Sequence, residues 1–263
     1  MPELRVRDGV LQLLAPETSW LSTGWAGGRI RADAAYNCTV PDGWNRTNLD
    51  EYSTERRTGA GFDREGPTLL TGVEMRHARC GQLSAERDTS STEGETNSVD
   101  VLAVATAGVS NPAVLFPDGA GSGVPDTAPA SETDPPDPGT VNLLVHVDYP
   151  VTAGALANLV AVAAEAKAAT LLRETGFPGT TTDAVIAGAT DRVEPGDGPS
   201  GPGVEPAQFT GSGTPIGGAV RLCVRDALQA SLDARYDETP PPDTVAAAEH
   251  GVCTDRSANV FRP

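Results

Sequence analysis

Lysine is almost absent from this chain of 263 residues: Lys167 is the single lysine, and eighteen arginines supply the other full positive side-chain charges. With 36 acidic and 19 basic residues, the formal net charge is −17. A chain this acidic repels a phosphate backbone at long range, and no basic stripe along the sequence reverses that repulsion. We therefore expect no nucleic-acid partner and no binding to anionic membrane surfaces.

The lack of lysine, together with abundant Asp, Ala and Gly and few aromatic residues (5%), favours a protein adapted to high salt. At molar salt the Debye length falls to about 3 Å, so repulsion among the many carboxylates is screened. The alternative is an acidic protein from a low-salt environment.

Cysteine is also scarce, and its spacing excludes the common metal and redox motifs. The four cysteines form no C-x-x-C pair and have no matching histidine pattern; they are Cys38, Cys80, Cys223 and Cys253. We expect free thiols rather than a disulfide framework, and no metal or other cofactor.

Long hydrophobic runs and a secretion signal are missing as well. No stretch approaches 18 apolar residues, and residues 1–28 lack a basic segment followed by an apolar one. We expect a cytoplasmic protein that does not span a membrane.

The second half of the chain alternates strands and helices. Buried strands are predicted over 99–107, 141–147 and 182–189, and helices over 152–174 and 216–234. Thr152 is a suitable N-cap for the first of these helices, and Gly176 is a suitable end. We expect an α/β fold (α+β is possible) in which a mixed sheet packs with helices in a single domain, residues 1–235.

The first half is dominated by strands and polar segments. A hairpin turns at Asp8-Gly9, residues 21–28 form a glycine-rich tight loop, and 69–73 is a strand or the start of a helix. Three acidic, low-complexity segments have little to bury and are expected to be flexible insertions: 81–98, 117–138 and 191–207. Residues 236–263 are rich in proline, and we expect a loosely attached tail.

Lys167 lies on the apolar side of the helix predicted over 152–174. At 100° per residue it shares a stripe roughly 80° wide with Leu156, Ala163 and Leu171, whereas Glu165 lies on the opposite side. An ammonium turned toward a core requires an anionic or strongly polar partner. Burial without a partner favours a neutral amine that acts as a base, whereas pairing with Asp183 favours a charged ammonium with an electrostatic role.

Five short loops rich in Gly, Ser, Thr and Asn lie beside the predicted strands. Glycine lets backbone N–H groups approach a ligand, and the hydroxyl and amide side chains can hold a polar group. Each loop alone is most simply a turn, but five together predict a convergent polar pocket. The candidate binding residues in them are Ser22, Thr23, Gly27, Gly28, Thr106, Gly108, Asn111, Gly139, Asn142, Thr180 and Thr214.

Two residues near these loops are candidates for proton transfer or orientation. His146 is a natural general base if it is exposed in the pocket; the alternative is a hydrogen-bonded histidine of a strand. Asp183 follows three threonines and could orient a hydroxyl; the alternative is a carboxylate that satisfies loop amides.

Taken in order, these segments resemble the adenosylcobinamide amidohydrolase family of corrinoid salvage, in a haloarchaeal form. The matching motifs are A-G-V-x-N, P-G-T-x-N, E-A-K and G-T-x-T-D, and the matching segments are 22–28, 36–40, 105–113, 138–171, 179–189 and 209–228. The resemblance adds Asn37 and Glu165 to the candidate binding residues and gives Lys167 a context, because E-A-K belongs to the family pattern.

The resemblance implies hydrolysis of the amide that joins aminopropanol to a corrin propionate, with the corrinoid as small-molecule substrate. The alternatives are a non-catalytic corrinoid-binding protein and a hydrolase of another small amide. Amide hydrolysis requires a nucleophile, an oxyanion stabiliser and an acid for the leaving amine. Hydroxyls are available from Thr140, Thr180, Thr181 and Thr182. Proton transfer or charge is available from Lys167, His146 or Asp183, and oxyanion donors from the backbone near Gly108 and Gly139.

Overall fold

The computed structural model describes residues 2–41, 43–44, 46–86, 98–115, 140–191, 204–248, 251–254 and 257–263. In the described residues the strands are β1 (Glu3–Arg7), β2 (Val10–Ser22), β3 (Gly28–Thr39), β4 (Thr68–Thr71), β5 (Arg79–Glu86), β6 (Ser98–Ala107), β7 (Ala113–Val114), β8 (Val141–Val147), β9 (Ala184–Thr190) and β10 (Val252–Cys253). The helices are α1 (Leu49–Gly59), α2 (Ala153–Thr175) and α3 (Pro215–Arg235), with short 3₁₀ turns η1 (Met75–His77) and η2 (Val245–Ala247).

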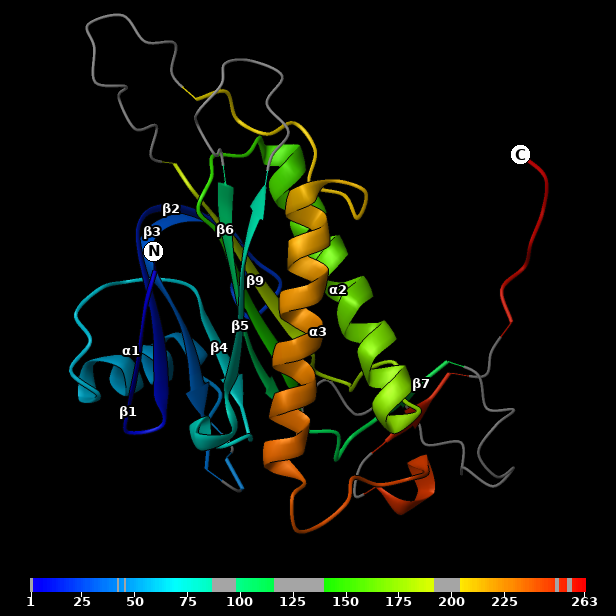
Figure 1. Ribbon diagram of the computed structural model, residues 1–263. Coiled ribbons are helices and arrows are strands. Elements are labelled where there is room, and N and C mark those ends of the chain that lie inside the picture. Colours follow the sequence, from blue (N-terminus) through cyan, green and yellow to red (C-terminus); the bar gives the residue numbers. More distant parts are fainter. Residues whose placement is uncertain are drawn as a thin grey trace, which may run out of the picture.

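Eight strands form one mixed sheet in the order β4-β3-β2-β9-β8-β6-β5, and β1 pairs with β2. The segment β8-α2-β9 is a parallel crossover, whereas β2 with β3 and β5 with β6 are antiparallel hairpins. The predicted α/β class, with a mixed sheet packed with helices, is confirmed. Helices α2 and α3 lie side by side and cover one face of β5, β6, β8 and β9 (Figure 1).

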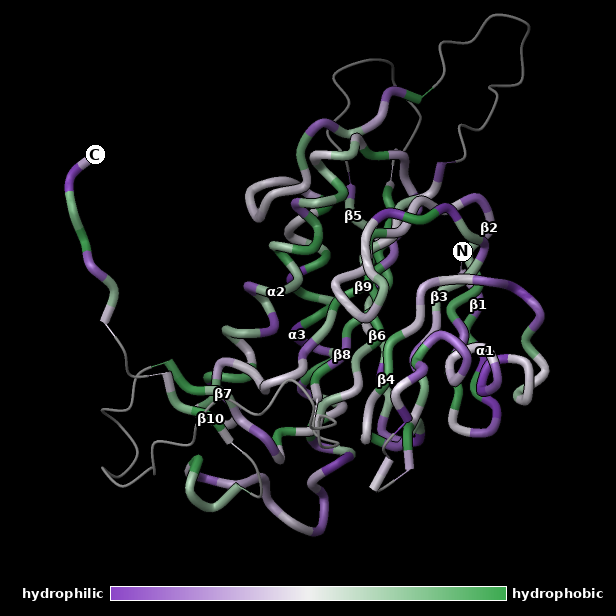
Figure 2. The backbone as a smooth tube through the Cα atoms, turned by 180° about the vertical axis from the view of Figure 1, so that it is seen from behind, coloured by the Kyte–Doolittle hydropathy of each residue, from purple (hydrophilic) through white to green (hydrophobic). Residues whose placement is uncertain are grey.

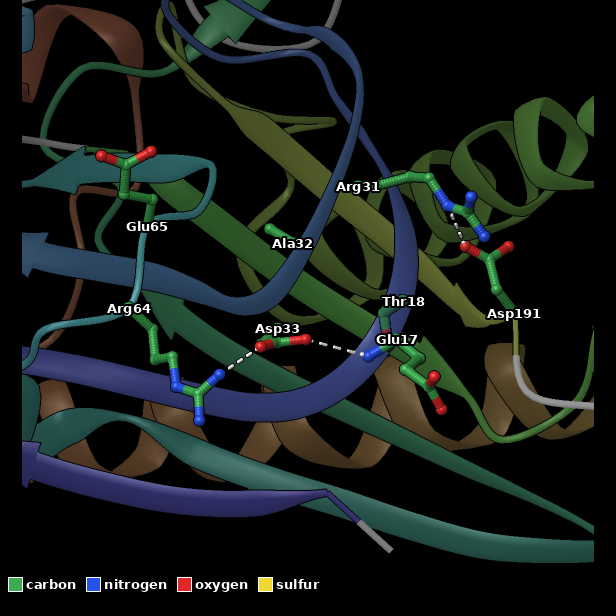
Figure 3. A pocket seen from close by; sticks show the side chains of 8 residues that line it. All are labelled: Glu17, Thr18, Arg31, Ala32, Asp33, Arg64, Glu65 and Asp191. Carbon is green, nitrogen blue, oxygen red and sulfur yellow. Dashed lines mark hydrogen bonds and ion pairs between the residues drawn. The ribbon is translucent and has the colours of Figure 1, made fainter.

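Strand β2 bends sharply in its middle, and because of this bend one half of the sheet folds over the other half. The register of β2 with β3 shifts between Leu14 and Thr18, and Glu17 has a left-handed φ of 53°. The Glu17 N–H donates to Asp33 Oδ1, and its carbonyl accepts from the Asp191 N–H at 2.6 Å. Asp33 also pairs with Arg64 (Figure 3), so charged side chains hold the corner from outside.

Because of the bend, β3 and β4 fold over the face of β6 and β8 that the helices leave open. Strand β4 contacts β8 directly, and the two lie close together when the molecule is seen from behind (Figure 2). A second core fills the space between the two halves of the sheet; its largest members are Leu13, Trp20, Leu69, Leu144 and Ile186. The polar helix α1 lies outside β3 and completes a four-layer arrangement (Figure 1).

Helix α2 matches its prediction closely. The Thr152 side chain caps it by accepting from the Ala155 N–H, and Gly176 ends it with a φ of 79°. The helix is long and apolar enough to cross a membrane by composition alone. Its apolar side instead packs in the core against α3 and β9, as the central helix of a soluble domain does.

Three parts of the chain differ from the prediction. Residues 81–86, expected in an exposed insertion, belong to β5, because a mostly exposed edge strand needs few apolar residues to pair with β6. Strand β3 and helix α1 were not predicted. In the tail expected to be loose, Val245 is buried and β10 pairs with β7, so both segments are attached to the domain. The expected insertion at 117–138 lies outside the described residues, as do 87–97 and 192–203.

Candidate functional site

The polar cluster lies where β8 and β9 begin, at one end of the core between the two half-sheets. Along β8, Val141, Leu143 and Val145 face the helices, so Asn142 and His146 face the other half-sheet. This alternation brings side chains of β3, β6 and β8 together with the turn that precedes β9.

The carboxylate of Asp183 is the centre of the cluster, and its side chain is only 10% exposed. Oδ1 accepts from the Val141 N–H at 2.9 Å and from the Thr180 hydroxyl. Oδ2 accepts from the Thr180 N–H at 3.0 Å and from the ammonium of Lys167. Four donors therefore hold one carboxylate in a fixed orientation.

Lys167 reaches this carboxylate from the middle of α2, with a side chain that is 12% exposed. Among the described residues, Asp183 is its only hydrogen-bond partner, so two of its three N–H groups remain available. Gly179 makes the approach possible: a Cβ on it would lie 2.5 Å from Asp183 Oδ2 and 3.1 Å from Lys167 Nζ. The inward orientation of Lys167 predicted from the helical stripe is what the structure has.

Thr140 begins the strand next to this pair. Its hydroxyl donates to the Thr182 carbonyl at 2.7 Å and lies 3.4 Å from Asn142 Oδ1. The Thr140 carbonyl accepts from the Gly108 N–H at 3.2 Å. The backbone and the side chain of Thr140 are thus held separately, and the residue is 3% exposed.

A chain of side-chain hydrogen bonds crosses from Thr140 to the other half-sheet. Asn142 Nδ2 donates to Asn37 Oδ1 at 3.0 Å and to the Leu70 carbonyl at 2.9 Å. Asn37 Nδ2 in turn donates to Thr106 Oγ1 at 2.9 Å. Asn37, Thr106 and Asn142 are almost fully buried, so this network sets the position of β3 relative to β8.

Asn111 contributes a further group beside the cluster. Its Nδ2 donates to Thr181 Oγ1, and the Thr181 N–H donates to the Asn111 carbonyl at 3.1 Å. Asn111 is 3% exposed, yet its Oδ1 accepts no hydrogen bond from the residues that the structure describes. A buried acceptor without a donor carries a desolvation penalty of about 1–3 kcal/mol, which a ligand N–H would relieve.

The loop between β2 and β3 adjoins the cluster. Thr23 makes two hydrogen bonds to Val185, both 2.9 Å long: its N–H donates to the carbonyl and its hydroxyl accepts from the N–H. Ser22, Gly27 and Gly28 line a pocket of about 450 Å³ between this loop, α1 and residues 65–68, which we call the loop pocket.

Three predicted site residues lie away from the cluster. His146 is four residues along β8 from Asn142, about 13 Å at about 3.3 Å per residue, where its Nε2 contacts Thr18 Oγ1. Burial lowers the pKa of His146 to about 3. Glu165 is exposed and pairs with Arg221, while Thr214 caps α3. Periodicity predicted on which face of its strand or helix a side chain lies. It did not predict how far along that element the side chain lies from the cluster.

One of the two predicted oxyanion donors is occupied: the Gly108 N–H donates to the Thr140 carbonyl, so it is not free for a substrate oxygen. The other, Gly139, lies outside the described residues, and its role stays a prediction.

Another pocket, of about 550 Å³, lies at the bend of β2, and we call it the corner pocket. Figure 3 shows its lining, which includes Arg31 paired with Asp191 and Arg64 paired with Asp33. The sequence analysis predicted no site there. Among the described residues, no group of three His, Cys, Asp or Glu side chains is arranged to hold a metal ion.

Comparisons with known proteins concern the chain as a whole. The family model for adenosylcobinamide amidohydrolase matches residues 3–240. A curated adenosylcobinamide amidohydrolase of Halobacterium salinarum is 47% identical over 265 residues, covering 100% of both chains. Another, of Methanosarcina mazei, is 28% identical over 234 residues, 89% of this chain and 98% of that protein.

Solved structures are more distant. A protein from Pyrococcus horikoshii is 14% identical with a TM-score of 0.43, covering 88% of this chain and 78% of its own. A β-aminopeptidase from Burkholderia is 15% identical with a TM-score of 0.42, covering 87% and 80%.

Proposed function

The chain belongs to the adenosylcobinamide amidohydrolase family, and on this premise we propose that the cluster around Asp183 is its reaction centre. The reaction is hydrolysis of the amide between aminopropanol and a corrin propionate of adenosylcobinamide. It yields adenosylcobyric acid, which returns to coenzyme B12 assembly. The single observation that carries the assignment is the nearly buried Lys167–Asp183 pair beside the hydroxyl of Thr140.

Lys167 acts as a fixed positive charge. Asp183 holds the ammonium in place, and the three other donors hold Asp183, so little reorganisation is needed when charge develops. The two remaining N–H groups of Lys167 donate to the substrate carbonyl oxygen as it becomes an oxyanion. This is the electrostatic role expected for a lysine paired with Asp183.

Thr140 supplies the nucleophile. It directly precedes Val141, whose N–H binds the same carboxylate as Lys167, and its hydroxyl donates to the carbonyl of Thr182, the residue before Asp183. The Thr140 oxygen attacks the amide carbon, its proton passes to the nitrogen of the leaving aminopropanol, and water then hydrolyses the resulting ester. The unpartnered Oδ1 of Asn111 accepts from the substrate amide N–H.

The test is incubation of purified protein with adenosylcobinamide, followed by mass analysis of the corrinoid. The wild type should release adenosylcobyric acid, and Lys167→Met should lower kcat by about a hundredfold or more, the usual effect of losing an oxyanion donor. Thr140→Ser should keep activity, whereas Thr140→Val should lose it.

The outcomes separate the alternatives. Tight binding with unchanged corrinoid after long incubation would identify a binding protein, and cleavage of aminopropanol amides that lack the corrin would identify a broader amidase. Substantial activity in Thr140→Val would make water, rather than Thr140, the nucleophile. A covalent corrinoid adduct on Thr140, trapped by acid quenching and detected by mass, would support the ester step.

We further propose that the enzyme works in a salt-rich cytoplasm without a bound metal. A net charge of −17 and a single lysine support the first part, as does the 47% identity to a protein of Halobacterium salinarum. Unfolding temperature and activity should rise together from 0.1 M to molar KCl, because screening removes self-repulsion. Dialysis against a chelator should leave activity unchanged.

A further inference from the structure

Trp25 is exposed to 60%, yet its indole is fixed in orientation. Its Nε1–H donates to Asp50 Oδ1 of α1 at 3.1 Å, which ties the β2–β3 loop to the helix. The loop turns tightly around it: Ala26 has a φ of 47°, and a Cβ on Gly27 would lie 2.4 Å from the Ser22 carbonyl oxygen. The turn thus presents one face of a large aromatic ring without burying it.

This ring lines the loop pocket, whose lining combines apolar and polar side chains. Trp25, Ile30 and Pro67 supply apolar surface, and Ile30 is itself 43% exposed. Ser53 and Thr54 of α1 supply hydroxyls, and the lining also includes the charged side chains Arg29, Asp50, Arg57 and Glu65. The corner pocket adjoins it, because Glu65 lines both, and adds about 550 Å³ of space.

A corrin is a flat macrocycle with methyl groups on its faces and edges and carboxamide arms around its rim. Apolar surface for the ring and hydroxyl groups for the carboxamides are what such a ligand requires. We propose that the loop pocket binds the corrin macrocycle, with the ring against Trp25 and Ile30. This inference rests on the proposed function, since it names where that substrate lies.

The position of the pocket fits this role because one loop joins it to the reaction centre. Ser22 lines the pocket, and the next residue, Thr23, is bonded to Val185, two residues from Asp183. On the other side of the loop, a Cβ on Gly24 would lie 2.6 Å from the side chain of Leu69. The loop that lines the pocket is therefore hydrogen-bonded to the strand that follows Asp183, although no residue of the reaction centre lines the pocket itself.

The experiment compares Trp25→Ala, Trp25→Phe and Ile30→Asp with the wild type at constant high salt. We expect Trp25→Ala to raise KM for adenosylcobinamide about tenfold with kcat within twofold, because ring contact is lost and the reaction centre is untouched. Trp25→Phe should retain most of the affinity, and Ile30→Asp should lose it. Phe209→Ala is the matched control, because Phe209 is an exposed aromatic (77%) on the loop before α3.

Binding of adenosylcobyric acid, measured by calorimetry, separates this proposal from the proposed function, because this product no longer carries the aminopropanol amide that the enzyme would hydrolyse. A tenfold weaker Kd in Trp25→Ala and Ile30→Asp would support the pocket assignment even if the wild type proved not to hydrolyse the amide. Unchanged KM and Kd in both variants would overturn it while leaving the reaction intact. If Trp25→Ala does not fold, Ile30→Asp and Trp25→Phe decide the matter by the same two measurements.

Discussion

The Lys167–Asp183 pair predicts an unequal response when either partner is removed. In Asp183→Asn the ammonium of Lys167 loses the negative charge of its only partner among the described residues while its side chain stays almost buried. Breaking a buried pair in this way costs about 3–5 kcal/mol, because an uncompensated charge remains. In Lys167→Met the carboxylate keeps two backbone N–H donors and the Thr180 hydroxyl, so the loss is about 1.5–3 kcal/mol, that of one charge-assisted hydrogen bond.

Urea unfolding in a constant high concentration of KCl at neutral pH measures both values. The midpoint of Asp183→Asn should lie below that of Lys167→Met, with similar m-values. The double variant should be no less stable than Asp183→Asn, because removing the lysine also removes the unpaired charge. If Lys167→Met is the less stable of the two, or if the two losses simply add, then the ammonium does not depend on Asp183 and the proposed centre is wrong.

Two further predictions follow from buried contacts. Burial lowers the pKa of His146 from 6.5 to about 3, so below pH 6.5 the unfolded chain binds a proton that the folded chain refuses. This contribution is full well above pH 6.5 and is lost as the pH falls toward 3; between pH 8 and 4.5 the wild type should lose about 2–3 kcal/mol that His146→Leu keeps, and parallel urea profiles would contradict this. Gly179→Ala should displace the Asp183 carboxylate and reduce kcat at least tenfold, whereas Gly154→Ala, where a Cβ meets open space, should not; equal activity of the two variants would refute the close packing.

Helix α2 could be predicted from the sequence because its signals are local. Apolar residues recur with the period of a helix, Thr152 provides the cap and Gly176 the end. The inward position of Lys167 follows from the same period. The strands β6 and β8 could be predicted because they are rich in apolar residues, as expected for strands that are mostly buried on both faces.

Strand β3 and helix α1 could not be predicted because their stability is not local. The exposed first half of β3 reads Gly-Arg-Ile-Arg-Ala-Asp, and it is a strand because it pairs with β2 around the bend. Helix α1 has few apolar residues; the Asn48 cap and the burial of Tyr52 and Arg57 hold it in place. Neither the pairing nor the packing is visible in the residues themselves.

The face of β8 that carries the site residues could be predicted from the sequence, but their position along the strand could not. Period-two alternation places Asn142 and His146 on the same face of β8, but only the pairing of β8 with its neighbours shows which of the two meets the turn before β9. The contact of Asn37 with Thr106 depends on the folding of one half of the sheet over the other, which arises at Glu17.

The buried amides of Asn37 and Asn142 fix the position of the two half-sheets relative to each other. If one half-sheet shifted by a single residue pair relative to the other, several amide and hydroxyl groups would be left without hydrogen-bond partners in an apolar environment. Each such group would cost about 1–3 kcal/mol. Hydrophobic side chains nearby would tolerate such a shift far better, since their attraction has no direction. Correct packing of the two half-sheets and correct placement of Thr140 therefore occur together during folding.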